Sequence, residues 1–244
     1  MTILSNPARI GSFTSSEIYN LLKKDRSGKG FGVPALTYIE ERNMARRLGR
    51  SLTTETNARP TTWGKCLEPL AFQKLGFDYE LVSDVTITHP DIPYWCGSPD
   101  IVVISSPNDR TGRVGDIKCP QTLKSFCQFV DCMDAPNPIE AIRANHSSGE
   151  QYYWQLVSNA ILTNSYFAEL IIYVPYRSDL DEIRLTASDN KAFKWIEYAD
   201  YYELPWLIEG GHYQDLNVIR FHVPQSDKDL LTNAVIEAGK LLQI

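Results

Sequence analysis

Two aspartates and a lysine in the stretch GSPDIVVISSPNDRTGRVGDIKCP, residues 97–120, have the types and spacing that hydrolytic chemistry needs. Asp100 and Asp116 supply carboxylate oxygens, which are the ligands that hard divalent cations prefer. Lys118 can orient an attacking water or balance the charge on a phosphate. Together these side chains predict metal-assisted hydrolysis of a phosphodiester.

A hairpin brings these residues together. We expect strands over 97–105 and 113–119, joined by a turn centred near Asn108. This register places Asp100 across from Asp116. Lys118 lies two residues beyond Asp116, so strand alternation puts its ammonium on the same face.

The alternative is a surface hairpin whose charges form ordinary solvated pairs. Residues 101–104 argue against it, because the run Ile-Val-Val-Ile is apolar on both faces and predicts a strand buried on both sides. An unpaired buried charge costs several kcal/mol, so charges at the ends of such a strand need a function.

Composition indicates an ordinary globular protein. The chain has 244 residues, of which 43% are hydrophobic and 22% charged, and no linker divides it, so we predict a single domain over 1–244. The longest apolar runs, such as 170–174, cannot span a bilayer, and the N-terminus lacks a signal-peptide pattern. We therefore expect a cytoplasmic protein without a membrane partner. Five cysteines without a CxxC pair predict no disulfide framework, zinc site or iron–sulfur cluster.

The charge of the chain is unevenly distributed. The net charge is -6, but residues 1–65 hold eleven Lys or Arg against five Asp or Glu, a net of +6, and residues 66–244 have a net of -12. The simple explanation is chance clustering on solvated helix faces. A basic N-terminal part beside an acidic, cation-binding remainder would also allow a nuclease to hold the phosphate backbone.

Hydrophobic periodicity predicts alternating helices and strands. Helices are expected over 17–24, 35–48, 63–76, 122–130, 149–164 and 226–242, strands over 166–177 and 217–224, and a further strand and helix within 178–217. This order predicts an α/β fold with a central mixed sheet flanked by helices on both faces.

Two of the predicted helices carry candidate functional residues. Thr14, Ser15 and Ser16 precede helix 17–24 as N-cap residues, and a helix N-terminus of this kind attracts phosphate. Glu68 lies on helix 63–76 as a candidate carboxylate, or as a glutamate favoured only by the helix dipole.

Seven segments of the chain, in this order, resemble those of the phage lambda exonuclease and YqaJ-type viral recombinase family of the PD-(D/E)XK nucleases. Pro99-Asp100 and Asp116-Ile117-Lys118 match the superfamily signature. The wider segments are Arg9–Glu17, Arg26–Lys29, Trp63–Glu68, Cys96–Asp100, Asp116–Pro120, Tyr152-x-x-Gln155 and Tyr173–Pro175. The resemblance covers roughly residues 9 to 176.

The resemblance implies a restriction-endonuclease-like core and a magnesium-dependent exonuclease that uses two metal ions, with Mn²⁺ able to substitute for Mg²⁺. Glu68, Asp100 and Asp116 would ligate the metal together with the Ile117 carbonyl. Lys118 would activate or position the attacking water. Gln155 would support the site.

The family also implies a substrate and partners. The enzyme would degrade one strand of linear double-stranded DNA from the 5' end, in phage-type single-strand-annealing recombination. Arg9 and Ser16 would bind the terminal 5'-phosphate, and Lys29 would contact the DNA. The assembly would be a ring-shaped homotrimer working with a single-strand annealing protein.

One residue departs from the family pattern, and two other functions compete. Asp116 stands where close relatives usually have Glu, which makes single-metal behaviour an alternative. The same core serves restriction or defence endonucleases, which cut closed circular DNA. A catalytically weak DNA-end-binding module is the third interpretation, and the intact Asp100, Asp116 and Lys118 argue against it.

Overall fold

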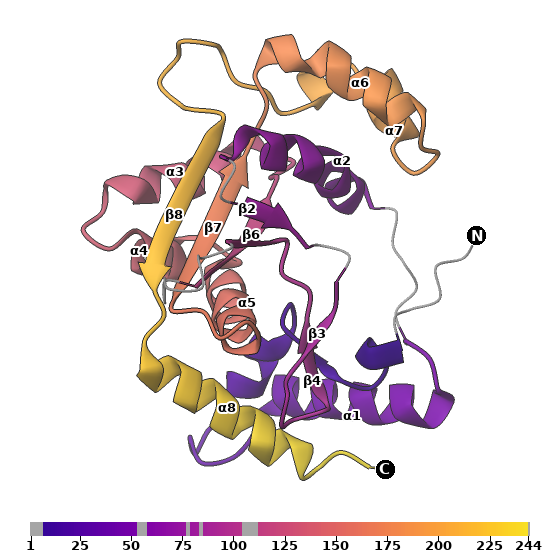
Figure 1. Ribbon diagram of the computed structural model, residues 1–244, viewed down its shortest axis with the longest axis vertical. Helices are drawn as coiled ribbons and strands as arrows, with labels where there is room; N and C mark the ends of the chain where they lie inside the picture. The colour runs from indigo at the N-terminus through magenta and orange to yellow at the C-terminus, as the bar shows by residue number, and fades with distance from the viewer. Residues whose placement is uncertain (1–6, 53–57, 77–78, 83–84, 104–111, 244) are drawn as a thin grey trace.

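A five-stranded mixed β-sheet forms the centre of the protein (Figure 1). The computed structural model describes residues 7–52, 58–76, 79–82, 85–103 and 112–243. The strand order is β2-β5-β6-β7-β8, with β2 at Tyr79–Leu81, β5 at Ile101–Val103, β6 at Arg113–Lys118, β7 at Phe167–Tyr173 and β8 at Leu216–His222. β6 and β7 run parallel, and the other neighbours are antiparallel.

The inner strand β7 is buried on both faces, as its sequence, apolar except for Glu169, predicts. Leu170 and Ile172 enter one hydrophobic core, and Ile171 and Tyr173 enter the other. On β6, Val114 joins the first core and Ile117 the second, so the side chains of Asp116 and Lys118 belong to the first face.

Helices cover both faces of this sheet, which confirms the predicted fold (Figure 1). The first core is closed by α3, Leu123–Val130, α4, Pro138–Asn145, α5, Gly149–Leu162, and α8, Gln225–Gly239. The second is closed by α2, Arg59–Lys74, α6, Leu180–Ser188, and α7, Lys194–Tyr198.

A small second sheet carries the segment that leads to Asp100. Its strand order is β1-β4-β3, with β1 at Phe13–Thr14, β4 at Trp95–Gly97 and β3 at Ile87–Thr88. Helix α1, Val33–Leu48, places Tyr38 beside β1, where its hydroxyl accepts the Thr14 N–H over 2.8 Å. The Trp95 indole donates to the Ser158 hydroxyl of α5 over 2.9 Å, which fixes the small sheet against the main core.

The N-terminal segment differs from its prediction. Instead of a helix over 17–24, the chain forms a 3₁₀ helix, η2, of five residues at Ile18–Leu22, whose N-cap is Glu17. Ser15 is not a cap, because its hydroxyl lies 2.8 Å from that of Ser158. An acidic cap on so short a helix removes the predicted phosphate-binding helix N-terminus.

Two further expectations can be compared with the structure, and a third lies outside the described residues. The segment 178–217, for which a strand and a helix are predicted, contains α6, α7 and the 3₁₀ helix η5, Tyr201–Glu203, and the 3₁₀ helix η4, Arg177–Asp179, overlaps its start. Within this segment, which the structure describes throughout, the only strand residues are the first two of β8, so it adds no further strand. The remaining 3₁₀ helices are η1, Pro7–Arg9, and η3, Asp131–Asp134. The turn near Asn108 lies outside the described residues. None of the helices in the described ranges combines the length and apolar character that a bilayer crossing requires.

Two glycines allow a test of how β4 is packed. A Cβ on Gly97 would stand 2.7 Å from Asn159 Oδ1 and 2.8 Å from Leu162 Cδ1 of α5. Overpacking of this kind costs about 1–3 kcal/mol, so Gly97→Ala should lower the free energy of unfolding by that amount in urea denaturation.

The matched control is Gly64 in the interior of α2, where a Cβ would meet nothing within 4 Å. Gly64→Ala should raise the free energy of unfolding by about 0.5–1 kcal/mol, because alanine is the better helix former. Equal effects of the two substitutions would contradict the close approach of β4 to α5.

Candidate active site

The pairing of β5 with β6 has the predicted register. Ile101 faces Gly115 and Val103 faces Arg113, and continuing the antiparallel ladder by one residue sets Asp100 opposite Asp116. Asp100 lies just before β5 and is held by a hydrogen bond, because the Ile117 N–H donates to its Oδ2 over 2.7 Å. The two aspartates are therefore brought together by the sheet itself.

Asp116 is buried at the centre of this arrangement, with 1% of its surface exposed. Gln155 of α5 donates from Nε2 to Asp116 Oδ1 over 2.8 Å. The Lys118 ammonium contacts Asp116 Oδ2 as an ion pair, and within the described residues this buried oxygen has no other polar partner. Asp116 is thus held on one side by the Gln155 amide and on the other by the Lys118 ammonium.

The electrostatics of the cluster favour added positive charge. Burial, and then the neighbouring Asp116 carboxylate, raise the pKa of Asp100 well above its ordinary value. Burial opposes the charge of Lys118, but the Asp116 and Asp100 carboxylates outweigh it and raise the lysine pKa. Lys118 is therefore held as an ammonium ion. Burial also raises the pKa of the Cys119 thiol, which disfavours the thiolate needed of a nucleophile.

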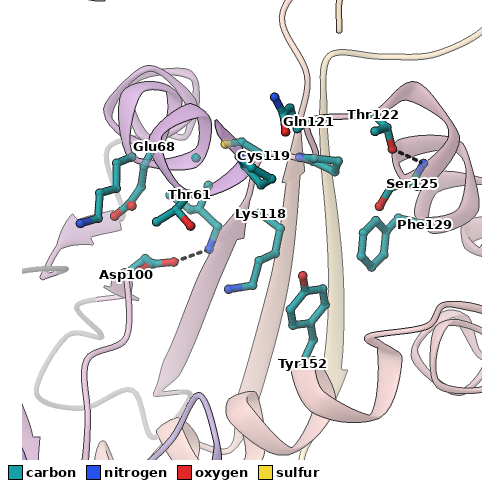
Figure 2. Close-up of a pocket in the computed structure, with 15 residues that line it drawn as sticks. Thr61, Glu68, Asp100, Lys118, Cys119, Gln121, Thr122, Ser125, Phe129 and Tyr152 are labelled. Atoms are coloured by element: carbon teal, nitrogen blue, oxygen red, sulfur yellow. Dashed lines mark hydrogen bonds between the residues drawn. The ribbon is translucent and has the colours of Figure 1, made fainter. Parts of the chain in front are cut away.

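A cavity of about 470 Å³ opens over this cluster (Figure 2). Glu68 on α2 and Asp100 lie at one end of it, and Lys118 reaches into it from β6 (Figure 2). Tyr152 of α5 forms part of the lining, with the Lys118 Nζ 5.0 Å from the centre of its ring. The aromatic face stabilises the ammonium and limits its positions.

The oxygen ligands of the site suit a hard divalent cation in type, but their present positions do not surround a common point. Within the described ranges, no group of three His, Cys, Asp or Glu side chains stands close enough together to hold a metal ion as it is. Glu68, Asp100 and Ile117 line the cavity, whereas Asp116 lies against the Lys118 ammonium. The buried Asp116 Oδ2 and the like charges of the carboxylates fit an oxygen-seeking cation.

Arg9 contacts the segment that precedes Asp100. Its Nη1 donates to the Ser98 hydroxyl over 2.9 Å, two residues before Asp100. Ser98 was not among the predicted site residues, and its position beside Asp100 in the Cys96–Asp100 segment is the signal that could have identified it. The hydrogen bond joins Arg9 to the segment of chain that leads from β4 to Asp100.

The other residues predicted to contact DNA, Ser16 and Lys29, make contacts elsewhere in the chain. Ser16 offers its carbonyl to Gln151 of α5, whose Nε2 donates over 3.0 Å, and its hydroxyl lies 3.5 Å from that of Thr14. Lys29 is exposed on a loop in which its backbone N–H donates to Asp25 Oδ1 over 3.3 Å. No described contact joins the Lys29 side chain to the cavity.

The arginines of α1 make intramolecular contacts. Arg42 lies over the Tyr38 ring at 4.9 Å, and Arg46 Nε donates to the Gly11 carbonyl over 2.8 Å. Arg47 donates to Glu40 over 2.7 Å. These contacts favour the simpler explanation for this part of the basic N-terminal region.

The raised pKa of Asp100 predicts how stability depends on pH without metal. Between the ordinary value of about 3.9 and its raised value, the folded protein keeps a proton on Asp100 that the unfolded chain releases. The free energy of unfolding should therefore fall as pH rises through this window. Urea denaturation in EDTA at several pH values measures it.

Asp100→Asn serves as the reference for that experiment, because it keeps the shape of the side chain without its titration. The wild type should lose more stability than this variant on going from about pH 4 to neutral pH. Parallel curves for the two proteins would show that Asp100 titrates normally.

Comparison with known proteins gives matches among solved structures. No protein-family model matches the sequence, and no curated protein matches it. The chain is similar to an alkaline exonuclease, LHK-Exo, from Laribacter hongkongensis, with a TM-score of 0.58 and 17% identity over 96% of this chain and 89% of that one. LHK-Exo in complex with dAMP gives 0.59 and 16%, over 96% and 90%. A phage-related exonuclease from Haemophilus somnus 129PT gives 0.60 and 14%, over 94% and 92%. At such identities, the likeness shows that the chain has the fold of these proteins.

Proposed function

We propose that this protein is a metal-dependent deoxyribonuclease, and specifically an exonuclease that degrades linear double-stranded DNA from the 5' end. The observation that carries the proposal is the cluster of Asp100, Asp116 and Lys118 beside a cavity large enough for part of a nucleotide strand. The fold shared with proteins described as exonucleases supports it.

The metal would be Mg²⁺, held by Asp100 and Asp116 with help from Glu68 and the Ile117 carbonyl. When bound, it would neutralise charge on the phosphate and make a water nucleophilic at neutral pH. Gln155 keeps Asp116 in one orientation through its amide. Lys118, held as an ammonium, donates hydrogen bonds to the water or to a phosphate oxygen, and Tyr152 guides its position.

The direction of digestion rests on Arg9 and Ser98. A terminal phosphate carries more charge than an internal one, and a guanidinium can bind it through paired hydrogen bonds. Ser98, to which Arg9 donates, lies two residues before Asp100 in the sequence. The pair can therefore hold a 5'-phosphate while the neighbouring linkage lies at the carboxylates. The homotrimer and the annealing partner remain predictions from the family resemblance.

The decisive experiment compares end-labelled linear duplex with covalently closed circular duplex, with and without Mg²⁺. We expect release of nucleotides from the linear substrate only, and only with metal. Asp100→Asn and Asp116→Asn should each reduce the rate at least about 100-fold, because each removes a charge that stabilises the transition state.

One control variant and two alternative outcomes make that experiment informative. Lys118→Met should lose turnover, since it keeps the length of the side chain without the ammonium, and circular dichroism in Mg²⁺ checks that the variant folds although Asp116 has lost its counter-charge. Cutting of the circle would favour an endonuclease, and DNA-end binding without hydrolysis would favour a binding module. Wild-type rates in either aspartate variant would refute the site assignment.

Arg9 should determine the preference for phosphorylated ends. Arg9→Ala should abolish the preference for 5'-phosphorylated over 5'-hydroxyl duplex, because the paired hydrogen bonds to the terminal phosphate are lost. Rates on both substrates are measured at one fixed salt concentration, since phosphate contacts depend strongly on salt.

Arg50→Ala is the matched control, because Arg50 is an exposed arginine of the same basic region. This variant should slow both substrates to the same extent, if at all. If Arg9→Ala also leaves the ratio of the two rates unchanged, Arg9 contributes only general charge.

A further inference from the structure

A second cavity continues from the catalytic one along the start of α3. Its volume is about 490 Å³, and Thr122 and Ser125 line both cavities. Lys124 and His146 line only the second one, and no Asp or Glu belongs to its lining. The first turn of α3 contains no acidic residue either. The surface leading away from the carboxylates is thus composed of cationic and neutral polar groups.

The hydrogen bonds of His146 determine which of its ring nitrogens carries the proton. The Ser148 backbone N–H donates to His146 Nδ1 over 3.1 Å, so Nδ1 must have a free lone pair. A neutral imidazole that accepts at Nδ1 carries its hydrogen on Nε2. His146 Nε2 lies 3.0 Å from Ser125 Oγ and is therefore the donor of that hydrogen bond.

This assignment leaves the Ser125 hydroxyl hydrogen available. Ser125 Oγ accepts from His146, and the Ser125 backbone N–H donates to the Thr122 hydroxyl over 3.2 Å (Figure 2). Among the described residues, His146 is the only hydrogen-bond partner of the Ser125 hydroxyl. The hydroxyl can therefore donate into the space that the two cavities share.

The aromatic neighbours of His146 keep this arrangement in place. Its ring stacks on Phe129 at a centroid distance of 3.8 Å, and Phe129 stacks on Tyr152 at 5.8 Å. Tyr152 is the ring over which the Lys118 ammonium lies. A continuous wall of stacked rings thus connects the Ser125 hydroxyl with the catalytic lysine.

We propose that Ser125, oriented by His146, donates a hydrogen bond to a phosphate oxygen of the nucleic-acid strand at the linkage next to the one at the carboxylates. This inference rests on the proposed nuclease function and assigns the second cavity to the same strand. Ser125 is the binding residue, and His146 is a positioning residue that acts through it.

The first test determines the tautomer of His146 directly and requires no measurement of enzyme activity. Nitrogen-15 NMR of the labelled protein near neutral pH should show the hydrogen of the His146 ring on Nε2. The Nδ1–H tautomer would overturn the proposal, because Ser125 would then have to donate to Nε2 and would have no hydrogen for a phosphate.

The second test measures binding of the strand. Ser125→Ala should raise KM for duplex DNA about tenfold and change kcat less than twofold, because a hydrogen bond to a charged oxygen is lost outside the reacting linkage. Ser125→Thr retains the hydroxyl and should restore most of the affinity. Circular dichroism of both variants confirms that each is folded.

A DNA with a methylphosphonate in place of the second phosphate identifies the contact. This substrate should lower wild-type affinity, and Ser125→Ala should then cause no further loss, since both changes remove the same hydrogen bond. Additive losses, or an unchanged KM in Ser125→Ala, would refute the Ser125 contact and leave the nuclease function intact. No cleavage of any DNA by the wild type would refute the nuclease function and this inference with it.

Discussion

The negative charge of the Asp116 carboxylate, buried inside β6, is the constraint on which the site depends. A buried carboxylate is stable only if hydrogen bonds and opposite charge replace the water it has lost. Gln155 supplies the hydrogen bond and Lys118 the charge. Asp100 adds a second negative charge nearby and accepts the Ile117 N–H. The cluster thus contains more carboxylate than one lysine can neutralise, and this imbalance favours a divalent cation.

Helix α5 connects this charge to the rest of the fold. Gln155 reaches Asp116 in the main sheet, and Ser158 binds both Ser15 and Trp95 beside the small sheet. At the other end of the helix, the Tyr153 hydroxyl donates to Asp227 of α8. One helix therefore sets the distance between the main sheet, which carries Asp116, and the small sheet, which leads to Asp100. A shift of α5 would therefore disturb the site even if both aspartates were unchanged in sequence.

The sequence predicted the parts of this arrangement that depend on short-range periodicity. Alternation along a strand placed Asp116 and Lys118 on one face, and the turn length set Asp100 opposite Asp116. The predicted helix over 17–24 is reduced to a 3₁₀ helix because tertiary contacts override local preference: residues 13–14 before it pair with β4, and Lys24 at its end pairs with Phe31. The contact between Arg9 and Ser98 joins residues 89 positions apart, and no local pattern reveals such a pair. The tautomer of His146 depends likewise on two hydrogen bonds that exist only in the fold.

The aspartate at position 116 is explained by the same charge balance. Its side chain is one methylene shorter than glutamate, so its carboxylate stays close to the β6 backbone, where Gln155 can hold it. The shorter side chain also extends less far into the cavity. The longer carboxylate in this site is Glu68, which lines the cavity from α2 on the opposite face of the sheet. If a divalent cation binds as proposed, the number of ions held would depend on how Glu68 and Lys118 rearrange, because a cation at Asp116 must displace the ammonium that now contacts it.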